Sequence, residues 1–447
     1  MKKDPLISIY ITSHNYGDYI EDAIMSAINQ SYSNKQIIIY DDCSGDNSRD
    51  IISKYENHRD IEVFFGDKIK GLRGASNFCI EKAKGEFVIR LDADDKLHEN
   101  FLELAVKEIN SDQRIEYIFT NYFYIDEFTK TIGVEILPKL NDRYEATSFP
   151  PHGACCIVKK SIYENHGYYD ESLSRQDGHE LWMKIILQKI NYTHLDLPLF
   201  YYRKHGDSLS SNKKYLFRDR SEIKNKLNVT DETRNICFIP IRKDIFERFD
   251  PIRTKILSNL IEEVKTSGRF QKIVISTDSD NIIEYLSDSD VIDLHDRRSI
   301  SNSGKTEVND AIIDFVSTMT PSRDDYDYFL IMNLTNIRTN HIHIIEAINS
   351  MSIYELDSLV SVYKEESVLY QMSELGMNPI NYDNQFKLRK ERDAVFVHNG
   401  AIKVLKMKYL LKDDPYGEKI GHIEMTREDS VFIKNQYEAD IYLNNHA

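Results

Sequence analysis

The stretch Val88-Ile89-Arg90-Leu91-Asp92-Ala93-Asp94-Asp95 decides the fold class of this 447-residue chain. Its first four positions are mostly apolar and predict a buried strand, and three carboxylates follow within the next four positions. A strand that carries acids at its carboxyl end is a common way to hold a divalent cation over a cleft. Carboxylates this close repel one another unless a cation or hydrogen-bond donors offset the repulsion. The alternative for such a pattern in isolation is a solvated acidic turn, so the surrounding sequence has to decide.

Strand-like and helix-like segments alternate through the first half of the chain. The predicted strands are Leu6–Thr12, Gln36–Tyr40, Ile61–Phe65 and Glu86–Leu91, and the predicted helices are Tyr19–Gln30, Arg49–Tyr55 and Ala75–Lys84. This rhythm predicts an α/β fold with a mostly parallel sheet and right-handed crossovers. Ligands of such sheets bind at the carboxyl ends of the strands, where Thr12, Asp41-Asp42 and Asp92–Asp95 all fall. Their convergence favours a binding site over a solvated turn.

The length of the chain predicts two domains, because 447 residues exceed one ordinary hydrophobic core. Between residues 208 and 234 the sequence becomes polar and charged, and we place the domain boundary near 228–234. A new series of strands and helices then begins at Asn235. We therefore predict an N-terminal domain over residues 1–230 and a second α/β domain over residues 235–447.

The overall composition excludes several classes of protein. A net charge of −16 argues against broad binding to a nucleic-acid backbone, and an anionic sugar nucleotide would need local help from a metal or an arginine. No apolar run approaches the ~18 residues of a membrane span, and no signal peptide precedes the first strand. The five cysteines lack zinc or redox spacing. We therefore expect reduced thiols and a cytoplasmic protein.

Several ordered motifs between residues 7 and 208 resemble the family 2 glycosyltransferases of the GT-A fold, which is a Rossmann-like nucleotide-diphospho-sugar transferase fold. They are Ile7-Ser8-Ile9-Tyr10-Ile11-Thr12-Ser13-His14-Asn15-Tyr16, Ala27-Ile28-Asn29-Gln30-Ser31-Tyr32, Asp41-Asp42-Cys43-Ser44-Gly45-Asp46, Gly71–Asn77, Ala83–Phe87, Asp92–Asp95, Arg175–Trp182 and Tyr202–Ser208. Matches in this order are far more specific than any one of them.

The resemblance implies roles for the acids and the arginine at the predicted sheet edge. Thr12 and Asp42 would contact the nucleotide base, and Arg73 would lie near the diphosphate. Asp92 would hold the ribose, and Asp94 would bind a Mn²⁺ or Mg²⁺ that bridges the phosphates. Asp95 would share the metal role, and His205 would complete the metal site; its alternative is an ordinary surface or core histidine. For Asp42 the alternative is a turn or helix N-cap residue.

Asp177 is the residue that the resemblance places as the general base of inverting members, where it removes the proton of the acceptor hydroxyl. Read from the residues alone, Asp177 precedes an apolar helix and could be a plain N-cap residue. Glu180, one helical turn further on, is the fallback base. His152 and Gly153 are expected to shape the acceptor pocket.

The second half resembles the acylneuraminate cytidylyltransferases, a family of nucleotidyltransferases. The matching pieces are Val274–Ser279, Met332–Asn336 and Asn399–Ile402. The positions that carry activity do not match, because the segment 239–249 lacks the glycine-containing loop that cradles phosphates and retains only Arg242 as an obvious phosphate partner. Phe432 and Lys434 stand where metal-binding acids are expected. We therefore predict a cytidylyltransferase-like domain without catalytic activity.

The sequence thus predicts an inverting, metal-dependent glycosyltransferase that transfers a sugar from a nucleoside-diphosphate donor, with UDP the first choice, to a glycan or surface-polysaccharide acceptor. One alternative is a bifunctional enzyme whose second domain activates a nonulosonic acid with CTP. Another is a scaffold with two inactive nucleotide-binding domains. No nucleic-acid partner and no transmembrane segment are expected. Peripheral contact with the inner membrane surface stays open, since lipid-linked acceptors are common for such enzymes.

Overall fold

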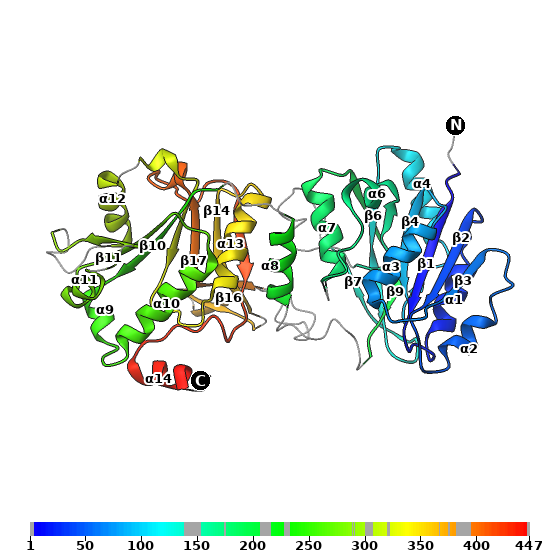
Figure 1. The fold of residues 1–447 in the computed structure, drawn as a ribbon, viewed down its shortest axis with the longest axis horizontal. Coiled ribbons are helices and arrows are strands. Elements are labelled where there is room, and N and C mark those ends of the chain that lie inside the picture. Colours follow the sequence, from blue (N-terminus) through cyan, green and yellow to red (C-terminus); the bar gives the residue numbers. More distant parts are fainter. Residues whose placement is uncertain are drawn as a thin grey trace. The chain divides into compact units, whose positions relative to one another are not determined.

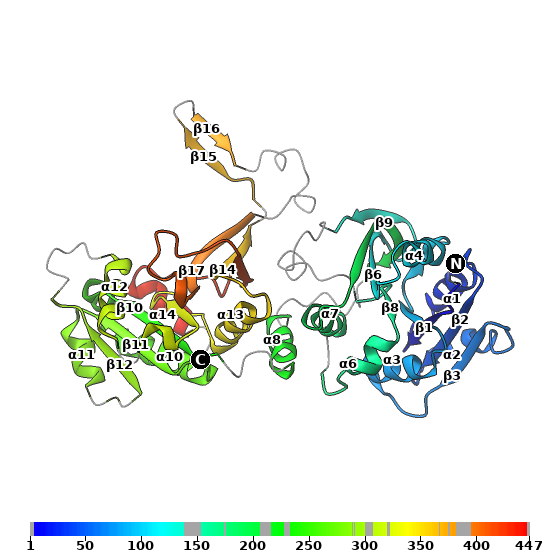
Figure 2. The ribbon, with the colours of Figure 1, turned by 90° about the horizontal axis from the view of Figure 1, so that it is seen from above.

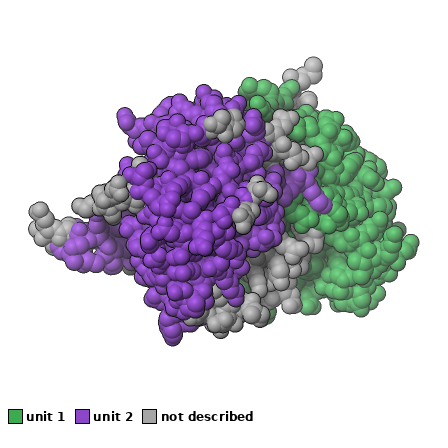
Figure 3. All heavy atoms as spheres, turned by 60° about the vertical axis from the view of Figure 1, so that its left-hand side comes forward, with its two compact units in different colours: residues 1–223 green, residues 224–447 purple. Residues whose placement is uncertain are grey.

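The computed structural model forms two compact units, residues 1–223 (unit 1) and 224–447 (unit 2) (Figures 1 and 3). Each unit is described by itself. The described residues are 4–137, 153–173, 176–205, 216–227, 233–287, 289, 291–299, 307–319, 322–365, 367–373, 376–380 and 395–444. Among them, no helix is both long enough and apolar enough to cross a membrane.

Unit 1 contains a mixed sheet whose first half is parallel. Strands β1 (Ile7–Ser13), β2 (Lys35–Asp41), β3 (Ile61–Phe65) and β4 (Phe87–Asp92) lie in the order β3-β2-β1-β4. In the register of this sheet, Ser13 pairs with Asp41 and Thr12 pairs with Asp92. The carboxyl ends of three strands therefore meet at one edge, as the strand–helix rhythm predicted.

The remaining strands of unit 1 extend the sheet beyond β4. The order continues β4-β8-β6-β9-β5, with β8 antiparallel to β4 and β9 parallel to β6. These strands are β5 (Lys96–Leu97), β6 (Tyr117–Ile125), β7 (Thr131–Glu135), which pairs with β6, β8 (Ile157–Lys159) and β9 (Tyr192–Arg203). The helices are α1 (Ile20–Ile28), α2 (Ser48–Ser53), α3 (Gly71–Lys82), α4 (Phe101–Ser111), α6 (Ser161–His166) and α7 (Asp177–Leu187).

Apolar cores lie on both faces of this sheet. Successive side chains of a strand point to opposite faces, so neighbouring residues of β1 pack into different cores. Ile9 and Ile11 of β1 pack into a core with residues of α1 and α4. Tyr10, between them in the sequence, packs into a second core with residues of α3 and α7, including Trp182. Helix α7 is therefore anchored to the sheet by its apolar face, which leaves its first turn near the carboxyl edge.

Two glycines bring the first turn of α7 close to the segment before β8. A Cβ atom added to Gly178 would lie 2.4 Å from the Cα of Gly153 and 3.0 Å from its backbone nitrogen. Real Cβ atoms do not approach backbone this closely, so the contact requires glycine at both positions. The amide of Cys155, two residues on, donates to the carbonyl of Arg90 in β4 at 2.7 Å. The start of α7 is thus held beside the end of β4.

Unit 2 contains a second α/β sheet, in the order β12-β11-β10-β13-β17-β14-β18. Strands β10 to β13 are parallel, and β17 runs antiparallel between β13 and β14. The strands are β10 (Asn235–Ile241), β11 (Lys272–Thr277), β12 (Ile292–Asp296), β13 (Tyr328–Met332), β14 (Ser358–Glu365), β17 (Val395–Lys406) and β18 (Ile420–Glu424).

The helices of unit 2 are α9 (Lys243–Glu247), α10 (Arg253–Ser267), α11 (Asp280–Leu286), α12 (Val308–Thr318), α13 (His341–Ile353) and α14 (Gln436–Asn444). Helix α8 (Leu216–Lys226) spans the boundary between the units. A separate hairpin of β15 (Tyr370–Ser373) and β16 (Gly376–Pro379) extends away from the sheet of unit 2 (Figure 2).

Replacing Gly178 by alanine should destabilise unit 1 by about 1–3 kcal/mol, because the added methyl group overlaps the backbone of Gly153. Gly133→Ala is the matched control, since its Cβ would make an ordinary 3.6 Å contact with Tyr124. Urea unfolding followed by the fluorescence of Trp182, the only tryptophan of the chain, reports on unit 1. Equal midpoints for the two variants would contradict the close backbone contact.

Candidate active site

The acidic run at the end of β4 forms the centre of the candidate site. Asp92 is the last residue of β4, and Asp94 and Asp95 lie in the turn that leads to β5. The side chain of Asp92 is 25% exposed and that of Asp94 is 13% exposed, whereas Asp95 is fully buried. The sequence therefore places two partly accessible carboxylates and one inaccessible carboxylate within four positions.

Asp95 is fixed by the neighbouring strands. Its Oδ1 accepts a hydrogen bond from the backbone N–H of Arg203 at 2.9 Å, and its own N–H donates to the carbonyl of Asp92 at 3.1 Å. Its Oδ2 is buried and has no hydrogen-bond partner among the described residues. Burial raises the pKa of Asp95 well above its usual range, and the charges of Asp94 and Asp92 raise it further. Burial likewise raises the pKa of Asp92 to about 6.

Asp94 lies against His205, and the metal site that the sequence assigned to both residues stays a prediction. The Nε2 atom of His205 is 3.0 Å from Oδ2 of Asp94. The imidazole also contacts the ring of Tyr19, with the ring centroids 5.4 Å apart. The chain places a histidine and a carboxylate, separated by more than a hundred residues, within hydrogen-bond distance.

Arg203, which our reading of the sequence did not single out, holds the end of β9 against the acidic turn. Its buried guanidinium donates to the carbonyl of Asp94 at 2.8 Å and to the carboxylate of Asp22 at 3.0 Å. It also lies over the ring of Tyr19 at 4.8 Å. Arg203 stands two residues before His205, so its contacts hold the end of β9, from which the chain leads to that histidine.

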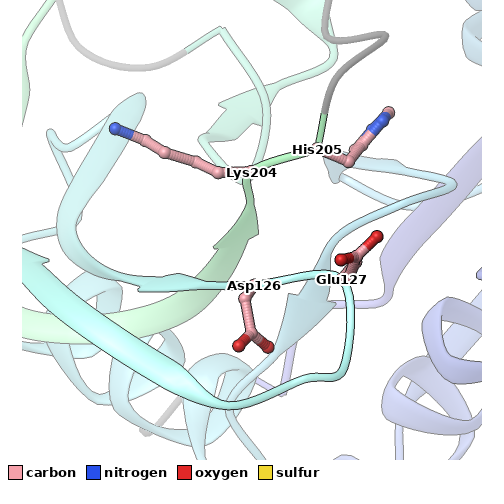
Figure 4. A pocket seen from close by; sticks show the side chains of 4 residues that line it. All are labelled: Asp126, Glu127, Lys204 and His205. Carbon is pink, nitrogen blue, oxygen red and sulfur yellow. The ribbon is translucent and has the colours of Figure 1, made fainter.

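An open pocket of about 370 Å³ adjoins the same histidine. Asp126 and Glu127 line one side of it, and Lys204 and His205 line the other (Figure 4). All four side chains are polar or charged, so the pocket suits a hydroxyl-rich or charged ligand better than an apolar one.

Thr12 and Asp42 lie at the carboxyl ends of β1 and β2. Thr12 is nearly buried and pairs in register with Asp92. The carboxylate of Asp42 accepts hydrogen bonds from the backbone N–H groups of Lys70 and Gly71, each at 2.8 Å. Asp42 therefore holds the start of α3 through a contact between distant segments, and it is not the N-cap of that helix, which is Lys70. Its contact with a nucleotide base stays a prediction.

Arg73, on the first turn of α3, is buried and forms an ion pair with Glu180 of α7. It also donates to the carbonyl of Asp170 at 3.4 Å. Glu180 in turn contacts Lys184 at 2.9 Å. Arg73 and the fallback base Glu180 are therefore ion-pair partners. A contact between Arg73 and the diphosphate stays a prediction.

Asp177 is the first residue of α7, and its carboxylate forms an ion pair with Arg90 of β4. The N-cap residue is Gln176, whose φ is 59°, so Asp177 is not the N-cap that the sequence pattern also allowed. Burial by itself would raise the pKa of Asp177, but the charge and hydrogen bond of Arg90 lower it overall. Asp177 therefore stays ionised at neutral pH, and its side chain is 14% exposed. Gly153 lies beside it, whereas His152 falls outside the described residues.

Comparison with known proteins identifies the family. Residues 8–167 match Glycosyl transferase family 2. Over 235 residues the chain is 31% identical to an Escherichia coli UDP-Glc:alpha-D-GlcNAc-diphosphoundecaprenol beta-1,3-glucosyltransferase, covering 52% of this chain and 90% of that protein. The chain belongs to glycosyl transferase family 2. Unit 1 of this glycosyltransferase has the GT-A fold that the sequence predicted.

Two further relatives extend the comparison. The glycosyltransferase is 38% identical over 210 residues to a putative teichuronic acid biosynthesis glycosyltransferase of Bacillus subtilis, covering 47% of this chain and 83% of that protein. It is 24% identical over 433 residues to a chondroitin synthase of Pasteurella multocida, covering 90% of this chain and 40% of that protein.

The buried carboxyl of Asp95 predicts a pH-dependent stability. Its pKa is raised in the folded state, so folding favours the protonated form and the free energy of unfolding falls as pH rises through that pKa. Without metal, Asp95→Asn should exceed the wild type in free energy of unfolding by about 1–3 kcal/mol at pH 8. This advantage should disappear as the pH falls to about 4, near the pKa of an unfolded aspartate, because asparagine cannot ionise.

Urea unfolding in EDTA, followed by Trp182 fluorescence, measures this difference. Asp112→Asn is the control, because Asp112 lies at the surface with Arg114, which holds its pKa at about 2. An Asp95→Asn protein that is less stable than the wild type at pH 8 would refute the assignment.

Proposed function

We propose that unit 1 transfers a sugar, with inversion, from a UDP-linked donor to a glycan acceptor with the help of a divalent cation. The observation that carries this proposal is the meeting of Asp92, Asp94 and Asp177 at one sheet edge, from segments far apart in the sequence. The printed activity of the Escherichia coli relative supports UDP as the carrier. The relatives named for teichuronic acid and chondroitin support a polysaccharide acceptor.

The residues present fit a divalent cation that takes part of its coordination from the donor. Among the described residues, no three His, Cys, Asp or Glu side chains are grouped as a complete metal site. Mg²⁺ is commonly held by one or two carboxylates together with substrate phosphates, and imidazole nitrogen suits Mn²⁺ acceptably. Asp94 and His205 would supply the protein ligands. Asp95 is fully buried, so the metal role that the sequence predicted for it is not part of this proposal. When bound, the cation would offset the negative charge of the departing nucleoside diphosphate.

Asp177 is the proposed base. Its carboxylate is ionised and partly exposed, and its position on the first turn of α7 is fixed by Arg90 and by the Gly153–Gly178 contact. It accepts the proton of the acceptor hydroxyl as that oxygen attacks the sugar. A carboxylate with a low pKa is a weak base, so the proton moves late, when the new glycosidic bond has made the hydroxyl more acidic.

For unit 2 we propose a nucleotidyltransferase-like fold without catalysis. The proposal rests on the resemblance of its sequence, and on the parallel order of β12, β11, β10 and β13. Phenylalanine carries no oxygen ligand and lysine carries a positive charge, so Phe432 and Lys434 supply no acid to a metal. The alternative of a second, CTP-dependent activity is part of the test below.

Thermal unfolding of the full chain with different nucleotides tests the proposed function. UDP should raise the melting temperature only when Mn²⁺ is present, by mass action on the folded state. GDP, dTDP and CDP should act less strongly. If none of the four nucleoside diphosphates raises the melting temperature, the proposal is contradicted. A rise with CTP or CMP would favour the bifunctional alternative.

Asp94→Asn should weaken the Mn²⁺-dependent binding of UDP by about tenfold or more, because the loss of a metal ligand costs at least 1.4 kcal/mol of binding free energy. Titration calorimetry with and without Mn²⁺ measures the effect. Asp112→Asn is a matched control, since Asp112 is a surface acid of unit 1 that pairs with Arg114 outside the candidate site. Unchanged Mn²⁺-dependent affinity in Asp94→Asn would remove Asp94 from the site.

Asp177→Asn should lower the rate of sugar transfer by about 10²–10⁴-fold, the usual contribution of a general base. The affinity for UDP with Mn²⁺ should stay close to that of the wild type, because Asp177 does not contact the donor in the proposed reaction. Initial rates and calorimetry on the same preparation measure both quantities. A parallel loss of UDP affinity and rate would refute the assignment of Asp177 as the base.

A further inference from the structure

We propose that Arg90 is a positioning residue that joins the donor-binding carboxylate Asp92 to the base Asp177 through one buried guanidinium. This inference rests on the proposed function of unit 1. Donor binding and the orientation of the base would then both depend on the side chain of Arg90.

The contacts of Arg90 divide between the two carboxylates. Its Nε is 2.8 Å from Oδ1 of Asp92, and its Nη2 is 3.4 Å from Oδ2 of Asp92. Its Nη1 forms the ion pair with Asp177. A guanidinium is planar and carries five N–H donors in fixed directions, so one arginine can orient two carboxylates at once. A lysine ammonium is a point charge and cannot reproduce this geometry.

The surroundings of Arg90 leave its guanidinium little freedom to move. The side chain is 7% exposed, and its backbone carbonyl accepts the amide of Cys155 at 2.7 Å. A Cβ added to Gly153 would lie 3.3 Å from Nη2 of Arg90. The guanidinium is therefore enclosed by β4 and the Gly153 segment, and Gly178, next to Asp177, touches that same segment.

The electrostatic balance at Asp177 involves groups from several elements. Arg90 of β4 and Arg73 of α3 favour its charge. Asp92 of β4 opposes it, and the phenol of Tyr169 also interacts with it. Arg90 is the only one of these groups that forms ion pairs with both Asp92 and Asp177 among the described residues. Its removal leaves two partly buried acids close together without their common counter-ion, which favours protonation of one of them.

A purely structural ion pair would behave differently from a positioning residue. Its loss would reduce the amount of folded protein, and the remaining folded molecules would show an unchanged pH profile. Loss of a positioning residue would change the catalytic behaviour of molecules that are still folded: the acidic limb of the rate profile would move to higher pH, because Asp177 would bind a proton more readily.

The experiment compares the wild type with Arg90→Met and Arg90→Lys in the full chain. The measured quantity is the rate of UDP release with Mn²⁺ from pH 5 to 9, at saturating donor, with water as the acceptor of the sugar. The donor is whichever of UDP-glucose and UDP-N-acetylglucosamine the wild type cleaves faster. Trp182 fluorescence gives the folded fraction of unit 1 at each pH. Lys224→Met is the matched control, since it removes a buried cation from an ion pair with Glu346 in unit 2.

For Arg90→Met we expect at least a tenfold lower rate per folded molecule at pH 7, weaker binding of UDP, and an acidic limb at higher pH. Arg90→Lys should keep the acidic limb near that of the wild type, because it keeps the charge, but should lower the rate through loss of the fork geometry. If Arg90→Met does not fold, the Arg90→Lys variant tests the inference instead. A rate and a UDP affinity of Arg90→Lys equal to those of the wild type would then overturn it.

An unchanged acidic limb and an unchanged rate per folded molecule in Arg90→Met would also overturn it, as would an equal change in Lys224→Met. A failure of the proposed function is distinguishable from these results, because it is seen in the wild-type protein alone. If the wild type neither binds UDP with Mn²⁺ nor cleaves either donor, the proposed function and this inference fall together.

Discussion

Charge compensation among acids at the carboxyl edge of one sheet is the constraint on which unit 1 depends. Asp92, Asp94, Asp95 and Asp177 meet there because β1 aligns β2 and β4, and because two glycines let α7 approach. Acids in such proximity repel one another at a cost that falls steeply when counter-ions are fixed nearby. Arg90 supplies part of that compensation from inside the protein through its ion pairs with Asp92 and Asp177, and the proposed cation would supply the rest from the donor side.

The two arginines have different tasks in this arrangement. Arg203 fixes the acidic turn to β9. Arg90 connects the turn to the helix that carries Asp177. Buried arginines of this kind are costly to desolvate, and they persist where several hydrogen bonds hold each one in place. The corresponding edge of unit 2 carries charges of both signs, since Arg242, Arg297 and Arg298 pair there with Asp244, Asp278 and Asp296.

The sequence predicted the parallel half of unit 1 well, because β1, β2 and β4 are short apolar runs that end in polar residues. It also named Asp94 and His205 as ligands of one metal; the two side chains are in contact, and the shared metal stays a prediction. It did not predict that Asp42 bonds the start of α3 or that Arg73 pairs with Glu180, since these contacts join distant segments and leave no local pattern. The role of Arg90 was hidden for the same reason: within an apolar strand it reads as one polar exception, and the partner that explains it lies 87 positions away.

The most direct test of the account is pulsed electron paramagnetic resonance of Mn²⁺ bound to the full chain with UDP. If Asp94, His205 and the diphosphate share one cation, the spectrum should show coupling to ³¹P and to an imidazole ¹⁴N. The ¹⁴N coupling should disappear in His205→Ala. A Mn²⁺ signal without ³¹P or ¹⁴N coupling, at concentrations where UDP is bound, would contradict the metal-assisted donor site on which the account of unit 1 is built.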